Sequence, residues 1–180
     1  MSPTLHSPDI RYREAFLRMY ASYYTAGESW CDATADALDS FESYVKKLHD
    51  DAAGIGIASD WVPTSHFWLR LGEDLVGTLR IRHYLTPAVE ERAGHIGYDI
   101  SPTFRRRGLG FEILRLGLIE ATALGIGDIL AICSQSNSAS RRILERHGAI
   151  AEKIRDEEVW YWIKRRPNQS PEPTSLFQKK

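Results

Sequence analysis

Three consecutive arginines, followed at once by two closely spaced glycines, are the residues of this chain whose types and spacing point most clearly to chemistry. Arg105, Arg106 and Arg107 lie directly before Gly108-Leu109-Gly110, where the apolar periodicity of a helix begins. The first turn of a helix carries N–H groups without internal partners and the positive end of the helix dipole. Glycine lets a backbone approach a bulky ligand, and arginine adds charge and paired donors. The segment therefore predicts a phosphate-binding turn.

This turn has three other interpretations. A dinucleotide-binding G-x-G-x-x-G pattern needs glycine at position 113, where the chain has Ile113. A P-loop ends in Gly-Lys followed by Ser or Thr, and Phe111-Glu112 does not supply that ending. A basic turn that interacts only with solvent stays open on the motif alone.

The hydrophobic pattern predicts the elements that must position the turn. Helices are expected over about 8–24, 36–49, 110–124 and 138–147, and strands over 66–71, 75–85, 94–100 and 128–133, with a final hairpin over 149–164 that turns near Asp156-Glu157. Residues 1–7, the stretch 50–65 and the charged run 90–92 are expected to be irregular. The order predicts one α/β domain over 1–165 and a disordered, proline-rich tail over 166–180.

The segment 66–164 resembles the GNAT superfamily of N-acetyltransferases. The hallmark of that family is (Gln/Arg)-x-x-Gly-x-(Gly/Ala) at a strand-to-helix turn, and residues 105–110 match it. Asn137 stands where the family has an asparagine that leads into a short helix, and Gly148 stands where that helix ends. GHIGYDISP and the arginine-rich turn together resemble a less characterised bacterial branch of acetyltransferases.

The resemblance implies a mixed, mostly antiparallel sheet flanked by helices and splayed between the strands near 94–100 and 128–133. It also implies acetyl-CoA as co-substrate, without a metal, with pantetheine in the splay and pyrophosphate on the turn. The residues expected to bind acetyl-CoA are Ile100, Ser101, Thr103, Arg105, Arg106, Arg107, Gly108, Leu109, Gly110, Asn137, Ser140 and Arg141. A helix cap is the alternative role of Asn137.

The family's usual catalytic side chains do not carry over to this chain. Many members have a tyrosine acid seven residues after the asparagine, where this chain has Leu144, and some have a glutamate near the position of Ile132. His95 and Asp99 share one face of the strand 94–100 and are the candidate bases. Their alternative roles are a hydrogen-bonded sheet histidine and a carboxylate that supports a turn.

Composition excludes several classes of partner. The 180 residues carry 23 Lys and Arg against 24 Asp and Glu, a net charge of -1, so a broad nucleic-acid surface is not expected. No signal peptide and no membrane-spanning stretch is recognisable, which predicts a soluble, cytoplasmic protein without a membrane partner. Cys31 and Cys133 are expected to be reduced thiols.

The leading functional hypothesis is an acetyl-CoA-dependent N-acetyltransferase in which an amine of a small molecule or protein attacks the thioester directly in a ternary complex. The first alternative is a catalytically weak acyl-CoA-binding or regulatory module on the same fold. The second is a protein- or nucleic-acid-binding domain without a cofactor. The acceptor stays open, with Trp61 and residues 25–34 expected to shape its pocket, and the final hairpin is a candidate homodimer interface.

Overall fold

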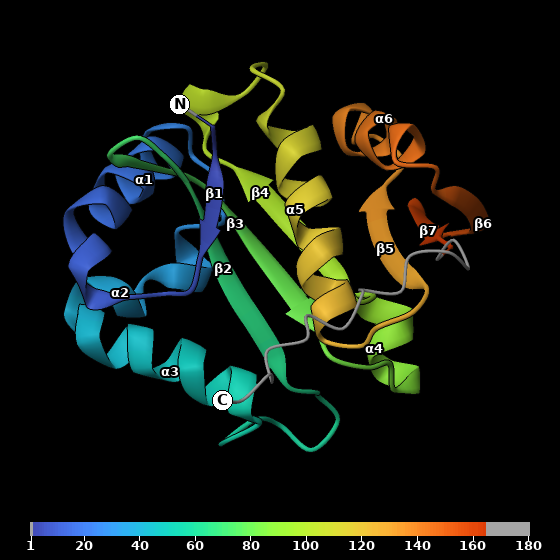
Figure 1. Ribbon diagram of the computed structural model, residues 1–180, viewed down its shortest axis with the longest axis horizontal. Coiled ribbons are helices and arrows are strands. Elements are labelled where there is room, and N and C mark those ends of the chain that lie inside the picture. The colour runs from blue at the N-terminus through green and yellow to red at the C-terminus, as the bar shows by residue number, and fades with distance from the viewer. Residues whose placement is uncertain (1, 165–180) are drawn as a thin grey trace, which may run out of the picture.

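Seven strands form one sheet in the computed structural model, which describes residues 2–164 (Figure 1). The strand order is β1-β2-β3-β4-β5-β7-β6. In chain order the elements are β1 (Thr4–His6), η1 (Ile10–Tyr12), α1 (Arg13–Thr25), η2 (Asp32–Thr34), α2 (Asp36–Asp39), α3 (Phe41–Ala53), β2 (Thr64–Leu71), β3 (Asp74–Arg82), α4 (Pro87–Arg92), β4 (Ile96–Ile100), η3 (Pro102–Phe104), α5 (Leu109–Ala123), β5 (Ile129–Ser134), α6 (Ser138–Arg146), β6 (Ile150–Arg155) and β7 (Glu158–Ile163).

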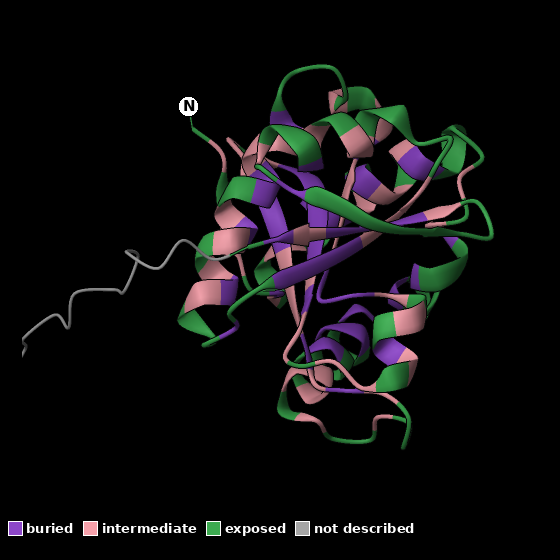
Figure 2. Ribbon diagram, turned by 90° about the vertical axis from the view of Figure 1, so that its right-hand side faces the viewer, coloured by how far each residue is buried: buried purple, intermediate pink, exposed green. Residues whose placement is uncertain are grey.

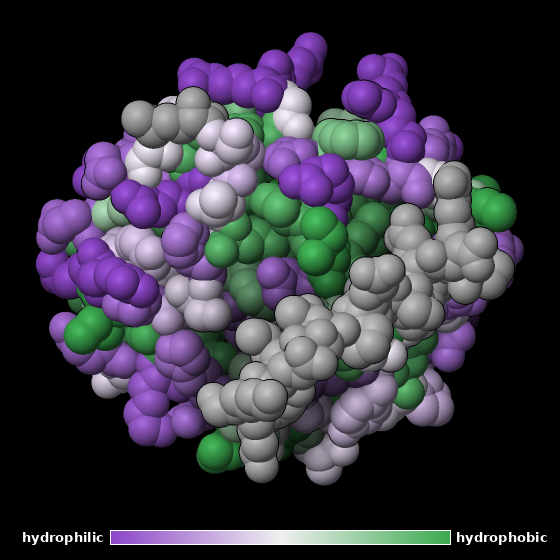
Figure 3. Space-filling view, viewed as in Figure 1, coloured by the Kyte–Doolittle hydropathy of each residue, from purple (hydrophilic) through white to green (hydrophobic). Residues whose placement is uncertain are grey.

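Helices cover both faces of the sheet, and each face has its own core. Leu79 and Ile81 of β3 pack with Ile113 and Leu114 of α5 in one core. On the other face Trp68 packs with an aromatic group from α1 and α3 that consists of Phe16, Phe41 and Tyr44. Burying such a side chain completely contributes about 1.5–3 kcal/mol. Figure 2 shows the buried strands between the two helical layers. In Figure 3 apolar surface gathers near the middle of the face that carries α5.

The predicted fold class is confirmed, with corrections at short elements. Residues 4–6, expected to be irregular, form the edge strand β1, because Thr4–His6 pair antiparallel with Trp68–Arg70. The run 90–92 belongs to helix α4, which Thr86 caps by accepting a hydrogen bond from the Val89 N–H at 3.3 Å. The expected helix 36–49 divides at Ser40, whose extended backbone ends α2 and whose hydroxyl caps α3.

The sheet is splayed between β4 and β5, as expected. The two strands are parallel, and their one register pair in the described chain is Ile96 with Ala131. Beyond that pair the strands share no register, and this separation, called the gap below, leaves β4 without a strand neighbour among residues 2–164 on that side up to Ile100. All other strand pairings in the described range are antiparallel.

Both cysteines in the described chain are free thiols. No helix of residues 2–164 combines the length and the apolar character that a membrane span needs. The tail expected over 166–180 lies outside the described residues.

Candidate functional site

Within the described residues no other strand pairs with the edge of β4 that faces the gap, although the Ile100 carbonyl on this edge accepts a hydrogen bond from Arg105 Nε. Ser101 N–H donates to Val76 O at 2.9 Å, and Arg82 N–H donates to His95 O at 2.8 Å. Residues that bond to one neighbouring strand alternate along a strand, so Tyr98 and Ile100 direct their backbone groups away from β3 and toward β5. An extended ligand in the gap would therefore find a strand edge to pair with.

The chain leaves β4 through a turn that ends at the exposed Gly108. Gly108 has φ +78° and forms the N-cap of α5 without any side-chain cap. A Cβ at this position would meet no atom within 4 Å, but it would be strained by the left-handed backbone. The N–H groups of Leu109 and Gly110 follow in the first turn of α5, where the helix dipole is positive. The uncapped start leaves these donors for an anionic ligand, which is the arrangement expected of a phosphate cradle.

The three arginines of the turn have different surroundings. Arg105 donates two hydrogen bonds to the Glu28 carboxylate, at 2.6 Å and 2.7 Å, and its Nε donates to Ile100 O at 2.9 Å. Arg106 has φ +63° and is exposed. Arg107 is exposed and its guanidinium lies 5.1 Å from the centre of the Phe104 ring. Arg106 and Arg107 are thus free to meet a phosphate, whereas Arg105 holds the turn in shape.

Ser101 and Thr103 attach the turn to α1 through one shared partner. Ser101 is completely buried, and its hydroxyl donates to Ser22 Oγ at 3.0 Å. The Thr103 N–H donates to the same Ser22 oxygen at 3.3 Å. The side chain of Ser101, expected to contact acetyl-CoA, therefore faces inward and supports the turn from below.

The residues expected on α6 lie across the gap from β4. Asn137 caps the helix, because its Oδ1 accepts from Ser140 N–H at 3.0 Å. Ser140 Oγ is 3.2 Å from Tyr98 Oη, and burial raises the pKa of Tyr98 to about 12. Arg141 donates to Tyr161 Oη at 3.1 Å and to Gln135 O at 3.3 Å. The structure thus brings Ser140 to the gap, while the Arg141 side chain is held toward β7.

His95 lies at the closed end of the gap. It is buried, and its Nδ1 accepts a hydrogen bond from Leu130 N–H at 3.0 Å. Burial, with the nearby Arg82 guanidinium, lowers the pKa of His95, so the ring is neutral near pH 7. The Nδ1 lone pair is already bonded to the backbone of β5, and the remaining ring proton is therefore assigned to Nε2. In this arrangement His95 joins β4 to β5 just before the strands separate.

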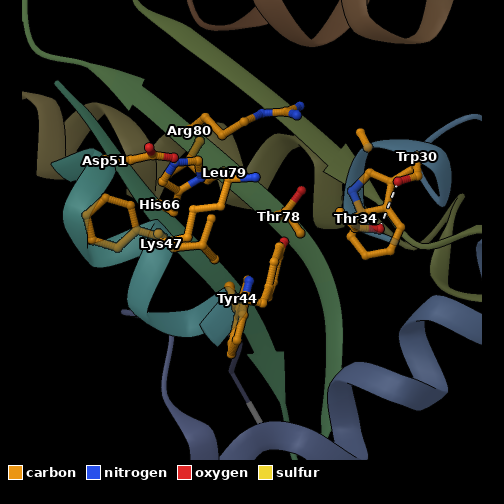
Figure 4. Close-up of a pocket in the computed structure, with 13 residues that line it drawn as sticks. Trp30, Thr34, Tyr44, Lys47, Asp51, His66, Thr78, Leu79 and Arg80 are labelled. Carbon is orange, nitrogen blue, oxygen red and sulfur yellow. Dashed lines mark hydrogen bonds and ion pairs between the residues drawn. The ribbon is translucent and has the colours of Figure 1, made fainter. Parts of the chain in front are cut away.

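Asp99 lies at the other end of β4, next to a cavity on the α1–α3 face. Its Oδ2 accepts from Arg80 Nη2 at 2.5 Å. A cavity of about 460 Å³ is bounded by Glu28, Ser29, Trp30, Ala33, Arg80 and Asp99. A second cavity of about 190 Å³ shares Trp30, Ala33 and Arg80 with it and extends under α3 (Figure 4). The two cavities are neighbours with a shared wall of Trp30, Ala33 and Arg80, and Asp99 at the end of β4 borders the larger of the two.

Comparison with known proteins accounts for this geometry. Residues 5–150 match the model of the acetyltransferase (GNAT) domain, which is most of the chain. The protein belongs to the GNAT acetyltransferase family. No curated protein matches the sequence of this GNAT chain.

Solved GNAT structures share the fold at low sequence identity. RimJ of Mycobacterium smegmatis, in complex with CoA-disulfide, is 22% identical, with a TM-score of 0.68 over 90% of this chain and 81% of that one. The microcin C7 self-immunity acetyltransferase MccE, in complex with acetyl-CoA and AMP, is 15% identical, with a TM-score of 0.66 over 90% and 92%. PseH of Campylobacter jejuni, in complex with acetyl coenzyme A, is 14% identical, with a TM-score of 0.57 over 91% and 99%.

Three residues around the candidate site, Arg80, Thr78 and His66, were not predicted from the sequence, whereas Glu28 lies within the stretch 25–34 that was expected to shape a pocket. Glu28 and Arg80 each bind a candidate residue, and Thr78 and His66 line the smaller cavity. Polar and apolar residues alternate in the strand 75–85, so Thr78 and Arg80 lie together on one face. Two polar residues on one face of a strand that is otherwise apolar indicate a candidate polar site. Trp30, from the stretch 25–34 predicted to shape an acceptor pocket, lines both cavities, whereas Trp61 lines neither and its ring centre lies 5.2 Å from the Arg82 guanidinium.

Proposed function

We infer that this protein transfers an acetyl group from acetyl-CoA to an amine. One observation carries the proposal: the edge of β4 at Tyr98 and Ile100, with which no other strand of the described chain pairs, leads through residues 101–107 to the uncapped start of α5 at Gly108. The strand edge suits the amide-rich pantetheine arm, and the helix start suits the pyrophosphate. The acetyl-CoA complexes of GNAT proteins with the same fold support this assignment.

The reaction follows from the groups that meet at the gap. The amine nitrogen forms a bond to the thioester carbonyl carbon, the C–S bond breaks, and the thiolate of CoA leaves with the electron pair. A backbone N–H on the free edge of β4 is suited to stabilise the charge that develops on the carbonyl oxygen. Holding both reactants in one place supplies the proximity contribution.

Asp99 is the proposed base that receives the amine proton. Its carboxylate borders the larger cavity at the end of β4, and the same carboxylate is anchored by Arg80. His95 is less suited, because its Nδ1 accepts the Leu130 N–H and its ring lies at the closed end. An alkylammonium group with an ordinary pKa of ~10.4 must lose a proton before it attacks, so a carboxylate acting directly or through water assists the step.

A catalytically weak acyl-CoA-binding module remains the second candidate function. Leu144 occupies the position of the family's usual tyrosine acid, and it is buried in the core at 1% exposure. A buried leucine cannot give a proton to the leaving thiolate. This observation favours a slow or regulatory protein over a rapid enzyme.

Two measurements test these candidates in order. Calorimetry with acetyl-CoA is expected to give a saturable signal; no binding at millimolar concentration would overturn both. Release of free CoA thiol is then followed with a panel of amines. Amine-dependent release supports the transferase, whereas binding without release across the panel supports the module.

A further inference from the structure

Four buried side-chain polar atoms without a hydrogen-bond partner come from one face of β2 and β3. They are His66 Nε2, Thr78 Oγ1, Arg80 Nε and Arg82 Nε. Thr78, Arg80 and Arg82 occupy every second position of β3 and therefore share one face of the strand. His66 of β2 is paired with Arg80 in the register of the two strands. An unpartnered buried polar group costs about 1–3 kcal/mol, so such a row of them points to a polar ligand.

Two of the four atoms, Arg80 Nε and Arg82 Nε, are donors, whereas Nε2 of the neutral His66 ring donates or accepts according to its tautomer. Arg80 and Arg82 carry guanidinium groups, and the Thr78 hydroxyl can donate or accept. Thr78 is only 8% exposed and faces the smaller cavity, where in Figure 4 it lies between His66 on one side and Trp30 on the other. Arg82 has no carboxylate partner among residues 2–164; its Nη1 donates to the carbonyl oxygens of Ala93 and Gly94 at 3.3 Å. The row is matched to an anionic oxygen group.

Two carboxylates border the row: Asp99 pairs with Arg80, and Asp51 lines the smaller cavity beside His66. Asp99 binds Arg80 through Nη2 and leaves Nε free. Asp51 Oδ2 is 3.2 Å from His66 Nε2, but the two atoms lack hydrogen-bond alignment. A ligand in this space meets donors at Thr78 and Arg80 and a carboxylate at Asp99, which is the pattern that recognises an anion and an amine on neighbouring atoms.

We propose that the acceptor is an amine that carries a carboxylate on the adjacent carbon, as a free α-amino acid does. The carboxylate accepts from the Thr78 hydroxyl and Arg80 Nε, and the amine lies beside Asp99 at the mouth of the gap. Trp30 and Tyr44 line the smaller cavity and offer an apolar wall to the side chain. Its volume of about 190 Å³ suits a group of amino-acid size. This proposal rests on the proposed acetyl transfer.

Amino acids and the same amines without their carboxylate test the proposed acceptor. The twenty L-amino acids and two decarboxylated counterparts, phenethylamine for phenylalanine and 3-methylbutylamine for leucine, are titrated into the full chain with CoA present, and binding is followed by calorimetry. Thiol release from acetyl-CoA is measured in parallel. The amino acids that bind are expected to do so at least about tenfold more tightly than amines without a carboxylate, since hydrogen bonds to a charged group are lost.

Two outcomes overturn the proposal: no free amino acid binds, or the decarboxylated amines bind equally well. Neither outcome contradicts the proposed acetyl transfer if acetyl-CoA still binds and another amine still causes release of thiol from acetyl-CoA. Loss of acetyl-CoA binding, by contrast, removes the proposed function itself.

Substitutions at Thr78 give a second, independent test. Thr78→Val keeps the shape and removes the hydroxyl, and it is expected to weaken amino-acid binding about tenfold while leaving acetyl-CoA affinity unchanged. Thr78→Ser restores a hydroxyl and is expected to recover most of the affinity. Thr122→Val on α5 is the matched control, because it removes a half-buried hydroxyl that bonds only Leu118 O within its own helix. If Thr78→Val and Thr122→Val have equal effects on amino-acid affinity, the carboxylate site is refuted.

Discussion

The Arg105 guanidinium forms a bidentate ion pair with the Glu28 carboxylate, with N–O distances of 2.6 Å and 2.7 Å. Arg105 belongs to the turn before α5, and Glu28 belongs to the loop after α1, which borders the larger cavity. The pairing lowers the pKa of Glu28, so this carboxylate is ionised at neutral pH. One contact thus connects the proposed acetyl-CoA turn with the wall of the proposed acceptor cavity.

Glu28→Gln is expected to weaken acetyl-CoA binding about two- to fivefold, because an exposed ion pair is worth up to ~1 kcal/mol and its loss loosens the turn. Calorimetry measures the effect. Asp60→Asn is the control, since it breaks an exposed ion pair with Arg92 of α4, at 2.6 Å, that lies outside the turn before α5. Equal acetyl-CoA affinities for the two variants would show that the Arg105–Glu28 pair does not shape the turn.

Gly108→Ala separates backbone strain from ligand binding. Alanine at φ +78° costs about 1–2 kcal/mol in unfolding free energy, and its methyl group would project into the space proposed for the pyrophosphate. Gly148→Ala is the control, because Gly148 has φ +79°, equally open surroundings and a place after α6. Both variants are expected to show the same loss in urea unfolding, and only Gly108→Ala is expected to lose acetyl-CoA affinity. A Gly108→Ala protein that binds acetyl-CoA normally would contradict the cradle.

The base hypothesis is tested by the pH dependence of kcat/KM. Asp99→Ala is expected to lower kcat/KM about 100-fold or more and to flatten the acidic limb, because a positioned base contributes 10²–10⁴-fold. His95→Ala is expected to retain the limb and to lose stability, since the Leu130 N–H then has no side-chain partner. If the acidic limb is unchanged in both variants, neither residue is the base.

Stability is expected to fall with acid, with His66 as one cause. Burial is the main reason that the pKa of His66 is lowered to about 4; Arg80 and Arg82 act in the same direction, and Asp51 opposes them. The unfolded imidazole takes up a proton below pH ~6.5 while the native one does not. The contribution of neutral His66 to the free energy of unfolding is therefore fully present above pH ~6.5 and is lost as the pH falls toward 4.

Urea unfolding of the wild-type protein and of His66→Gln between pH 7.5 and pH 5 measures this contribution. The wild type is expected to lose about 2 kcal/mol more than the variant across that range. Other imidazoles with lowered pKa values, His95 among them, act in the same direction, so the variant curve is shallower and not flat. Parallel curves would mean that the pKa of His66 is not lowered in the native state.

Local patterns were sufficient for the frame of the site. The left-handed Gly108, the helix that starts after it and the Asn137 cap each depend on a few neighbouring residues, and all three were readable in the sequence. The alternation of residues 94–100 also placed Asp99 and His95 on one face. Such features are local because backbone dihedrals and caps are decided within one turn of chain.

The sequence by itself determined the fold class, the family and the turn that starts α5, since each of these depends on patterns of residues that are contiguous in the chain. Only the tertiary structure decided what each side chain meets. Arg105 forms an ion pair with Glu28, which is 77 positions away. His95 accepts a hydrogen bond from the Leu130 N–H, and Asp99 accepts one from Arg80. Thr78 was left without a partner beside a cavity. Partners distant in sequence are selected by how strands register and helices pack, and no local pattern encodes that choice.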